Sequence, residues 1–203
     1  MLSAKQAIAV FALVCTVAAG AFAKKGTTRV DSNETIDLDG FWNDSDVKIV
    51  CDDLIAQCIA SPRVARFEDD NGRPATVIIG KISNKSSEYI DTSIVAKRFQ
   101  NAIINSGVLE FVSDSSERKA LRAEKADQDQ HASEDTAKSI DNEEAADFML
   151  LGEVNSIVQQ SGKTQMRTYF VTIQLHDLET NRIVFSGENS EIKKVIQRKK
   201  RKL

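Results

Sequence analysis

The side chains that could carry out chemistry are few and scattered in this sequence. There are two histidines, His131 in a polar stretch between helices and His176 on the more polar side of a strand. No serine or cysteine has a general base near it in sequence, which nucleophilic catalysis would require. Acidic pairs such as Glu143 and Glu144 suit glycoside cleavage, but one Trp and two Tyr offer few platforms for sugar rings. We therefore predict no catalytic residue, with a wall-polymer hydrolase as an alternative.

Cofactor and metal sites are not predicted either. Gly80 and Lys81 follow a strand, but the upstream glycine and the following hydroxyl residue of a phosphate-binding loop are missing. Cys51 and Cys58 lie seven residues apart in a stretch with helical periodicity, which separates them by about 10 Å along the helix axis. That distance is too long for a disulfide, and no nearby Cys or His completes a tetrahedral metal site. We predict two buried thiols.

Positive charge is concentrated at the C-terminus. Since the whole chain has 27 basic and 30 acidic residues, residues 1–192 carry a net charge of about −10. Each basic residue near an anionic membrane is worth about 1 kcal/mol, so this tail could attach to an anionic membrane, an anionic polymer or an acidic protein face. The other interpretation is a solvated terminus without a partner. An exported protein with an acidic body is not expected to bind nucleic acid. The candidate contact residues are Lys193, Lys194, Arg198, Lys199, Lys200, Arg201 and Lys202.

Residues 1–23 have the pattern of a secretory signal peptide. Lys5 precedes an apolar run over residues 7–19, and Ala21 and Ala23 form a small-x-small cleavage site. We predict cleavage after Ala23 and a soluble periplasmic protein. The alternative is an outer-membrane lipoprotein acylated at Cys15, although the bulky Val14 precedes that cysteine.

The rest of the chain is divided by composition into three parts. Residues 24–39 are polar and aperiodic and are predicted to form a short flexible lead. Residues 40–192 form a single globular domain, and residues 193–203 form the basic tail.

Helix and strand signals alternate through the first half of this domain. Asn43, with Asp46 three residues later, is typical of a helix start, and the helix is expected to end near residue 60. A strand over 75–82, a helix from Asp91 to Gly107 and a strand over 108–112 predict a parallel βαβ unit. Two further helices are expected after Asp114, which forms a capping box with Glu117, and after Ser133.

The last third of the domain reads as strands. Segments 148–158, 166–175 and 183–190 are strand candidates separated by short turns, with Asn181 suited to a positive φ. Alternation along 169–175 predicts one strongly buried face. The fold class is therefore α/β (mixed α+β): a mixed sheet of about five strands with about four helices, the βαβ unit preceding a C-terminal antiparallel meander.

Several segments resemble the penicillin-binding protein activator LpoB family. They are IDTSIVAKRFQNAIINSGVLEFVSDSSERKALRAEKADQ (90–128), ADFMLLGEV (146–154), LHDLETNRIVFSGE (175–188) and DLDGFWNDSDV (37–47). The resemblance implies an exported, non-enzymatic domain similar to the N-terminal domain of TolB, without a cofactor. It also implies a regulator of cell-envelope assembly that binds and activates a bifunctional peptidoglycan synthase, a class A penicillin-binding protein. No motif marks the partner-binding face.

A second function stays open beside this one. Related α/β domains resemble parts of the curli secretion channel, so the chain could be a structural or assembly subunit of an envelope secretion complex. Formation of a ring would favour that alternative, whereas a monomer that binds one synthase would favour the activator.

Overall fold

A computed structural model of the chain describes residues 28–31, 34–131 and 143–197. The chain divides into two units, residues 1–34 and residues 35–203. In the described part of the first unit, the Glu34 backbone N–H donates to the Asp31 carbonyl at 3.1 Å. All elements below belong to the second unit.

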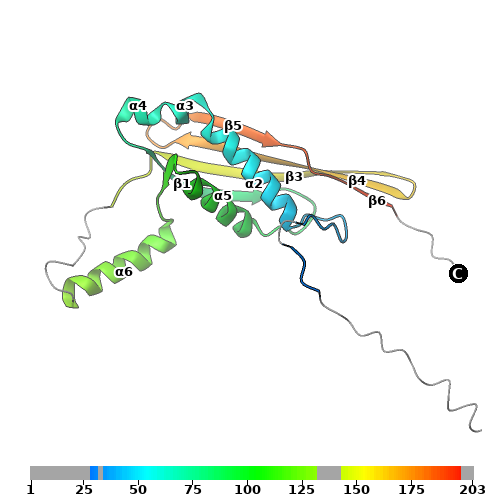
Figure 1. Cartoon of the computed structure of the whole chain (residues 1–203), viewed down its shortest axis with the longest axis horizontal. Coiled ribbons are helices and arrows are strands. Elements are labelled where there is room, and N and C mark those ends of the chain that lie inside the picture. The colour runs from blue at the N-terminus through cyan, green and yellow to red at the C-terminus, as the bar shows by residue number, and fades with distance from the viewer. Residues whose placement is uncertain (1–27, 32–33, 132–142, 198–203) are drawn as a thin grey trace, which may run out of the picture. The chain divides into compact units, whose positions relative to one another are not determined.

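A mixed sheet forms the centre of this second unit (Figure 1). Its order is β2-β1-β3-β4-β5, with a sixth strand, β6, also paired to β4. The parallel pairs β1–β2 and β1–β3 and the antiparallel pairs β3–β4 and β4–β5 confirm the predicted mixed class, the βαβ unit and the meander. The described strands are β1 (Ala75–Asn84), β2 (Leu109–Phe111), β3 (Phe148–Ser161), β4 (Thr164–Asp177), β5 (Ile183–Asn189) and β6 (Lys193–Gln197).

The predicted capping residues determine where the helices begin and end. Asn43 and Asp46 form a capping box at the start of the first long helix. Asp91 accepts from the Ser93 backbone N–H at 3.0 Å, and Gly107 ends the same helix at φ 66°. The described helices are α2 (Asp44–Ile59), α3 (Pro62–Ala65), α4 (Phe67–Asn71), α5 (Thr92–Ser106) and α6 (Ser115–His131). The two short helices α3 and α4 were not predicted, and the helix expected after Ser133 lies outside the described residues.

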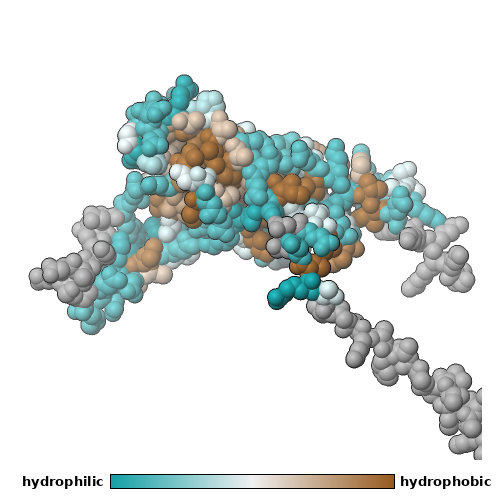
Figure 2. Space-filling view, in the orientation of Figure 1, coloured by the Kyte–Doolittle hydropathy of each residue, from teal (hydrophilic) through white to brown (hydrophobic). Residues whose placement is uncertain are grey.

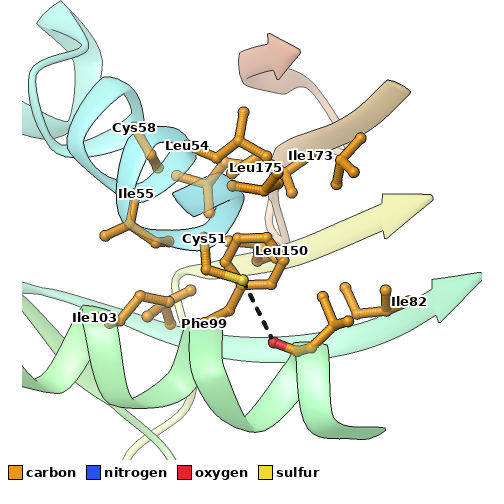
Figure 3. Close-up of a cluster of buried hydrophobic side chains, with 14 of the residues drawn as sticks. Cys51, Leu54, Ile55, Cys58, Ile82, Phe99, Ile103, Leu150, Ile173 and Leu175 are labelled. Carbon is orange, nitrogen blue, oxygen red and sulfur yellow. Dashed lines mark hydrogen bonds between the residues drawn. The ribbon is translucent and has the colours of Figure 1, made fainter. Parts of the chain in front are cut away.

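The core lies between one face of the sheet and the helices α2 and α5 (Figures 1 and 3). The predicted buried face of β4 is confirmed, since its inward side chains over residues 169–175 are at most 1% exposed. Cys51 and Cys58 are free thiols within this core, as predicted, and burial raises the pKa of each to about 12. The sulfur of Cys51 lies 4.0 Å from the Val95 carbonyl oxygen. Both thiols therefore pack as small apolar side chains.

Gly80 has a structural explanation. The pairing of β1 with β3 shifts between Ile79 and Ile82, which places a bulge at this glycine. A Cβ atom at Gly80 would lie 2.5 Å from a methyl group of Leu151, so a larger residue would displace that side chain.

The chain end differs from the prediction. Residues 193–197 were assigned to a basic tail, but they form β6, which pairs antiparallel with the outer half of β4. β5 and β6 occupy the same edge of β4 in succession, and between them the Tyr169 backbone N–H donates to the Ile192 carbonyl at 3.0 Å. The sheet thus has six strands in the described chain rather than about five.

No helix among residues 28–31, 34–131 and 143–197 has the length and apolar content needed to cross a membrane.

Candidate interaction surface

Lys194 is the best-defined of the predicted contact residues, and it is buried. Its side chain is 6% exposed, and its ammonium donates to Asp37 Oδ1 at 2.6 Å and to the Phe41 carbonyl at 2.8 Å. Asp46 Oδ2 lies 2.6 Å from the same ammonium, with 5% of its side chain exposed. We call Lys194, Asp37 and Asp46 the latch. It joins the segment before α2 to β6.

The latch residues have perturbed ionisation. Burial by itself would lower the pKa of Lys194, but its hydrogen bonds to the two carboxylates outweigh burial and raise that pKa. The hydrogen bond from Lys194 lowers the pKa of Asp37, which is half exposed. For Asp46, burial is the larger effect and raises the pKa. Asp46 therefore depends on Lys194 to remain charged inside the fold.

A second buried polar cluster lies beside the latch. The Glu88 carboxylate accepts from the Tyr169 hydroxyl at 2.6 Å and from Arg167 Nη1 at 3.4 Å. It also accepts from the Trp42 backbone N–H at 3.2 Å. The side chains of Arg167 and Glu88 are 9% and 8% exposed, so this pair is shielded from water. Burial raises the pKa of Tyr169, and the bond to Glu88 raises it further.

Aromatic side chains cover this cluster. The Arg167 guanidinium lies 4.3 Å from the centroid of the Phe41 ring, a cation–π contact. The Trp42 and Tyr169 rings meet edge to face at 5.1 Å. The Nε1 atom of Trp42 and the Nε atom of Arg167 are buried without a hydrogen-bond partner in the described structure. The cluster and the latch together fix residues 37–42 against β4 and β6.

An exposed groove runs beside the latch, and we call it the lead–β6 groove. Its volume is about 380 Å³. Leu38 is 91% exposed and Val195 is 59% exposed, so the groove offers apolar contacts, with the exposed Lys193 and Asp39 supplying charge of both signs. Figure 2 shows apolar surface near the outer end of the β3–β4 hairpin, where β6 lies alongside. The lining residues are Asp37, Leu38, Asp39, Gly40, Lys193, Lys194, Val195, Ile196 and Gln197.

The predicted site residues therefore separate into three groups. Lys193 is exposed at the start of β6. The expectation for Lys194 needs correction, because its ammonium is buried and already bound to two carboxylates. The remaining tail residues and the predicted processing residues lie outside the described structure. They are Arg198, Lys199, Lys200, Arg201 and Lys202, with Ala21, Ala23 and Cys15.

A second cavity, of about 370 Å³, is acidic and lies at the opposite end of β4. Its Asp147 accepts from Arg73 Nη2 at 2.7 Å and from the Thr76 backbone N–H at 2.8 Å. Burial would raise the pKa of Asp147, but these bonds outweigh it and hold the pKa below its usual value. The Thr180 backbone N–H lowers the pKa of Asp177. A glycosidase acid needs a raised pKa, so neither carboxylate supports the hydrolase alternative.

Neither buried cluster was predicted from the sequence. Asp37 and Lys194 are 157 positions apart, and Glu88 and Arg167 are 79 positions apart. One sequence feature does indicate that Lys194 is buried. It lies in a strand-like KKVIQ segment, between two residues that are exposed.

Comparison with known proteins gives one family match. The family model described as peptidoglycan-synthase activator LpoB matches residues 46–191. A direct comparison with curated proteins gives no match.

Solved structures give weaker likenesses. The LpoB C-terminal domain from Salmonella enterica is 15% identical, with 75% of this chain and 99% of that chain covered and a TM-score of 0.43. The NMR structure of E. coli LpoB is 13% identical, with coverages of 85% and 82% and a TM-score of 0.43. Lipoprotein GNA1162 from Neisseria meningitidis is 13% identical, with coverages of 60% and 84% and a TM-score of 0.38.

Proposed function

Because the chain belongs to the LpoB family of peptidoglycan-synthase activators, we propose that it binds a bifunctional peptidoglycan synthase of the class A penicillin-binding proteins and activates it. The family match over residues 46–191 is the observation that carries this proposal. The matched region begins in the first turn of α2 and ends at Glu191, shortly before β6. It therefore covers most of the described fold. Membership in this family makes the chain a regulator of peptidoglycan synthesis. Direct binding to the synthase is the additional claim that we propose.

Activation of this kind is a binding effect. A regulator without catalytic groups changes the rate of its target when it binds one conformation of that target more tightly than another. A tenfold preference for the active conformation corresponds to about 1.4 kcal/mol of differential binding. A rigid domain suits this role, because contacts that are already ordered lose little conformational entropy on binding.

We place the contact with an anionic surface at Lys193 and the tail residues Arg198–Lys202. Lys193 supports this placement, because it is exposed at the start of β6. Lys194 is left out, since its charge is used within the latch. The surface is either an anionic membrane or polymer or an acidic face of the synthase.

We also propose an envelope location reached by export. The signal-peptide pattern over residues 1–23, with cleavage after Ala23, supports a periplasmic protein, and acylation at Cys15 is the competing outcome. Mass spectrometry of the protein from its own cells distinguishes an N-terminus at Lys24 from a lipid-modified cysteine.

The test is a glycan-polymerisation assay with residues 24–203 and the bifunctional synthase of the same organism. We expect faster polymerisation at micromolar protein, together with direct binding measured by surface plasmon resonance. A variant that ends at Gln197 separates the tail from the fold, and it should still bind with weaker attachment at low salt.

Each result has a definite meaning. A folded protein that neither binds nor accelerates the synthase refutes the activator proposal. Binding that is unchanged by tail removal at low salt refutes the tail proposal and leaves the activator proposal standing. Measurable cleavage of peptidoglycan by the isolated protein would favour the hydrolase alternative.

A further inference from the structure

Two residue pairs in this chain have the composition that favours a reaction between a side chain and the next peptide bond. Of the nine glycines, only Gly40 follows an aspartate and only Gly72 follows an asparagine. In such a pair, the glycine nitrogen can attack the side-chain carbonyl carbon of the preceding residue and close a five-membered succinimide ring. Glycine favours this attack because it has no side chain to restrict its backbone. The two pairs differ in how the fold holds them.

The pair Asn71–Gly72 is held by the short helix α4. The Gly72 backbone N–H donates to the Glu68 carbonyl at 2.7 Å, so the attacking nitrogen is engaged. The Asn71 side-chain amide donates to the Phe67 carbonyl at 2.8 Å, which turns the side chain back along the helix. Both hydrogen bonds must break before the ring can close, so the fold slows the reaction at Asn71.

The pair Asp39–Gly40 lies in a bend before α2, outside any helix or strand, and Asp39 is exposed. Within the described structure, the Gly40 N–H has no hydrogen-bond partner. The Asp39 carboxyl group accepts from the Phe41 backbone N–H at 3.0 Å, an Asx turn that folds the side chain back over the Gly40 peptide group. The carbon that would be attacked is therefore held beside a nitrogen that makes no other described bond.

We propose that Asp39 isomerises spontaneously in the folded protein and that the product loosens the latch. The Gly40 nitrogen bonds to Cγ of Asp39, and its proton leaves with the carboxyl hydroxyl as water, which gives the succinimide. Water then adds to the backbone carbonyl carbon of Asp39 and breaks the bond from that carbon to the Gly40 nitrogen. The main chain now runs through Cβ and Cγ, and the former backbone carbonyl is a free carboxylate. The water lost in the first step is regained in the second, so the mass is unchanged.

The place of this peptide bond in the chain connects the reaction to the latch. Asp37 lies before it and the Phe41 carbonyl lies after it, and both accept from the Lys194 ammonium, at 2.6 and 2.8 Å. Isomerisation inserts one more main-chain carbon between these two contacts. Gly40 is also closely packed, since a Cβ atom there would lie 2.5 Å from Ile196 Cγ1. The longer chain strains the contacts and the packing together, so the isomerised protein should unfold more easily.

A single substitution compares the two sites with identical chemistry. Asp39→Asn places an asparagine–glycine pair in the bend as well as in α4, so only the fold distinguishes them. The variant is incubated at pH 7, both folded and unfolded in guanidinium chloride, and deamidation at each site is followed by peptide mass spectrometry. In the unfolded chain we expect similar rates at the two sites. In the folded protein, position 39 should react at least about tenfold faster than Asn71, because hydrogen bonds protect only Asn71.

Incubation of the wild-type protein tests the native residue. Endoproteinase Asp-N cleaves before aspartate but not before isoaspartate, so loss of cleavage at Asp39 measures the product. The isomerised fraction, separated by chromatography, should have a lower urea midpoint than the unmodified protein. Asp39→Glu is the control, because its longer side chain cannot close the five-membered ring, and its urea midpoint should not change during the incubation.

Isomerisation at Asp39 together with a lowered urea midpoint supports the proposal. The proposal is overturned if position 39 of the folded Asp39→Asn variant reacts no faster than Asn71. It is also overturned if Asp39 stays intact in the folded wild-type protein while it isomerises in the unfolded chain, or if the isomerised fraction is as stable as the unmodified protein. None of these outcomes depends on the synthase assay.

Discussion

Removal of the latch cation should destabilise the fold strongly. Lys194→Met keeps most of the side-chain volume but leaves the Asp46 carboxylate buried with 5% of its side chain exposed. Loss of one partner of a buried ion pair costs about 3–5 kcal/mol, because the remaining charge is uncompensated. The bond to the half-exposed Asp37 adds little, since exposed pairs contribute about 0–1 kcal/mol. We expect a loss of about 3–5 kcal/mol in the free energy of unfolding.

The measurement is urea denaturation at pH 7, followed by far-ultraviolet circular dichroism. Lys193→Met is the control, because this neighbouring lysine is exposed and should change stability by less than about 0.5 kcal/mol. Adding Asp46→Asn to Lys194→Met should recover most of the loss, since the amide carries no charge and its oxygen still accepts from the Asn43 backbone N–H.

The pH dependence of this variant gives an independent check. Burial already raises the pKa of Asp46, and removal of Lys194 should raise it further. A group whose pKa is higher in the folded state binds its proton more tightly there than in the unfolded state. Lowering the pH therefore stabilises the folded state. The deficit of Lys194→Met should therefore narrow between pH 7 and pH 4.5. A loss below about 1 kcal/mol, or a deficit that does not change with pH, would refute this reasoning.

Other substitutions test separate parts of the fold. Asp147→Ala leaves the Thr76 backbone N–H without its carboxylate acceptor and should cost about 2 kcal/mol in urea denaturation, whereas a neutral effect would contradict the role of this carboxylate. Asp91→Ala removes a helix N-cap and should lower the urea midpoint, with a loss of helical circular dichroism signal. Asn181→Val, at φ 57°, should lower the thermal midpoint, while Asn181→Gly should not. Hydrogen bonds hold the pKa of Asp91 and of Asp147 below the ordinary value of 3.8. The contribution of these carboxylates to the free energy of unfolding should therefore be complete above about pH 4 and should disappear as the pH falls further, which acid titration measures.

Local chemistry made much of this fold predictable from the sequence. Asn43, Asp91 and Gly107 mark helix ends through short-range hydrogen bonds and backbone preferences, and the alternation in β4 records a sheet with one buried face. The same local reasoning failed at β6. A run of lysines reads as a solvated tail, and the carboxylates that make Lys194 a buried residue lie at the other end of the chain.

The candidate surface was less predictable than the fold for the same reason. Glu88 and Arg167 sit in unremarkable sequence, and their pairing depends on how β4 passes the loop after β1. Strand propensity does not specify to within a residue where β1 stops pairing with β3, at Asn84. Contacts between distant segments decide which polar residues are buried and which remain available to a partner.

The latch also has a consequence for the order of the chain. Since Asp37 and Lys194 touch, the described domain begins and ends at nearly the same point in space. A circular permutant that joins Gln197 to Thr35 through a short Gly-Ser linker, and opens the chain at the exposed turn at Gly162, should keep the same core. In that permutant β6, the lead and α2 follow one another in sequence. The contact between Asp37 and Lys194, which are 157 positions apart in the native chain, then becomes a local one.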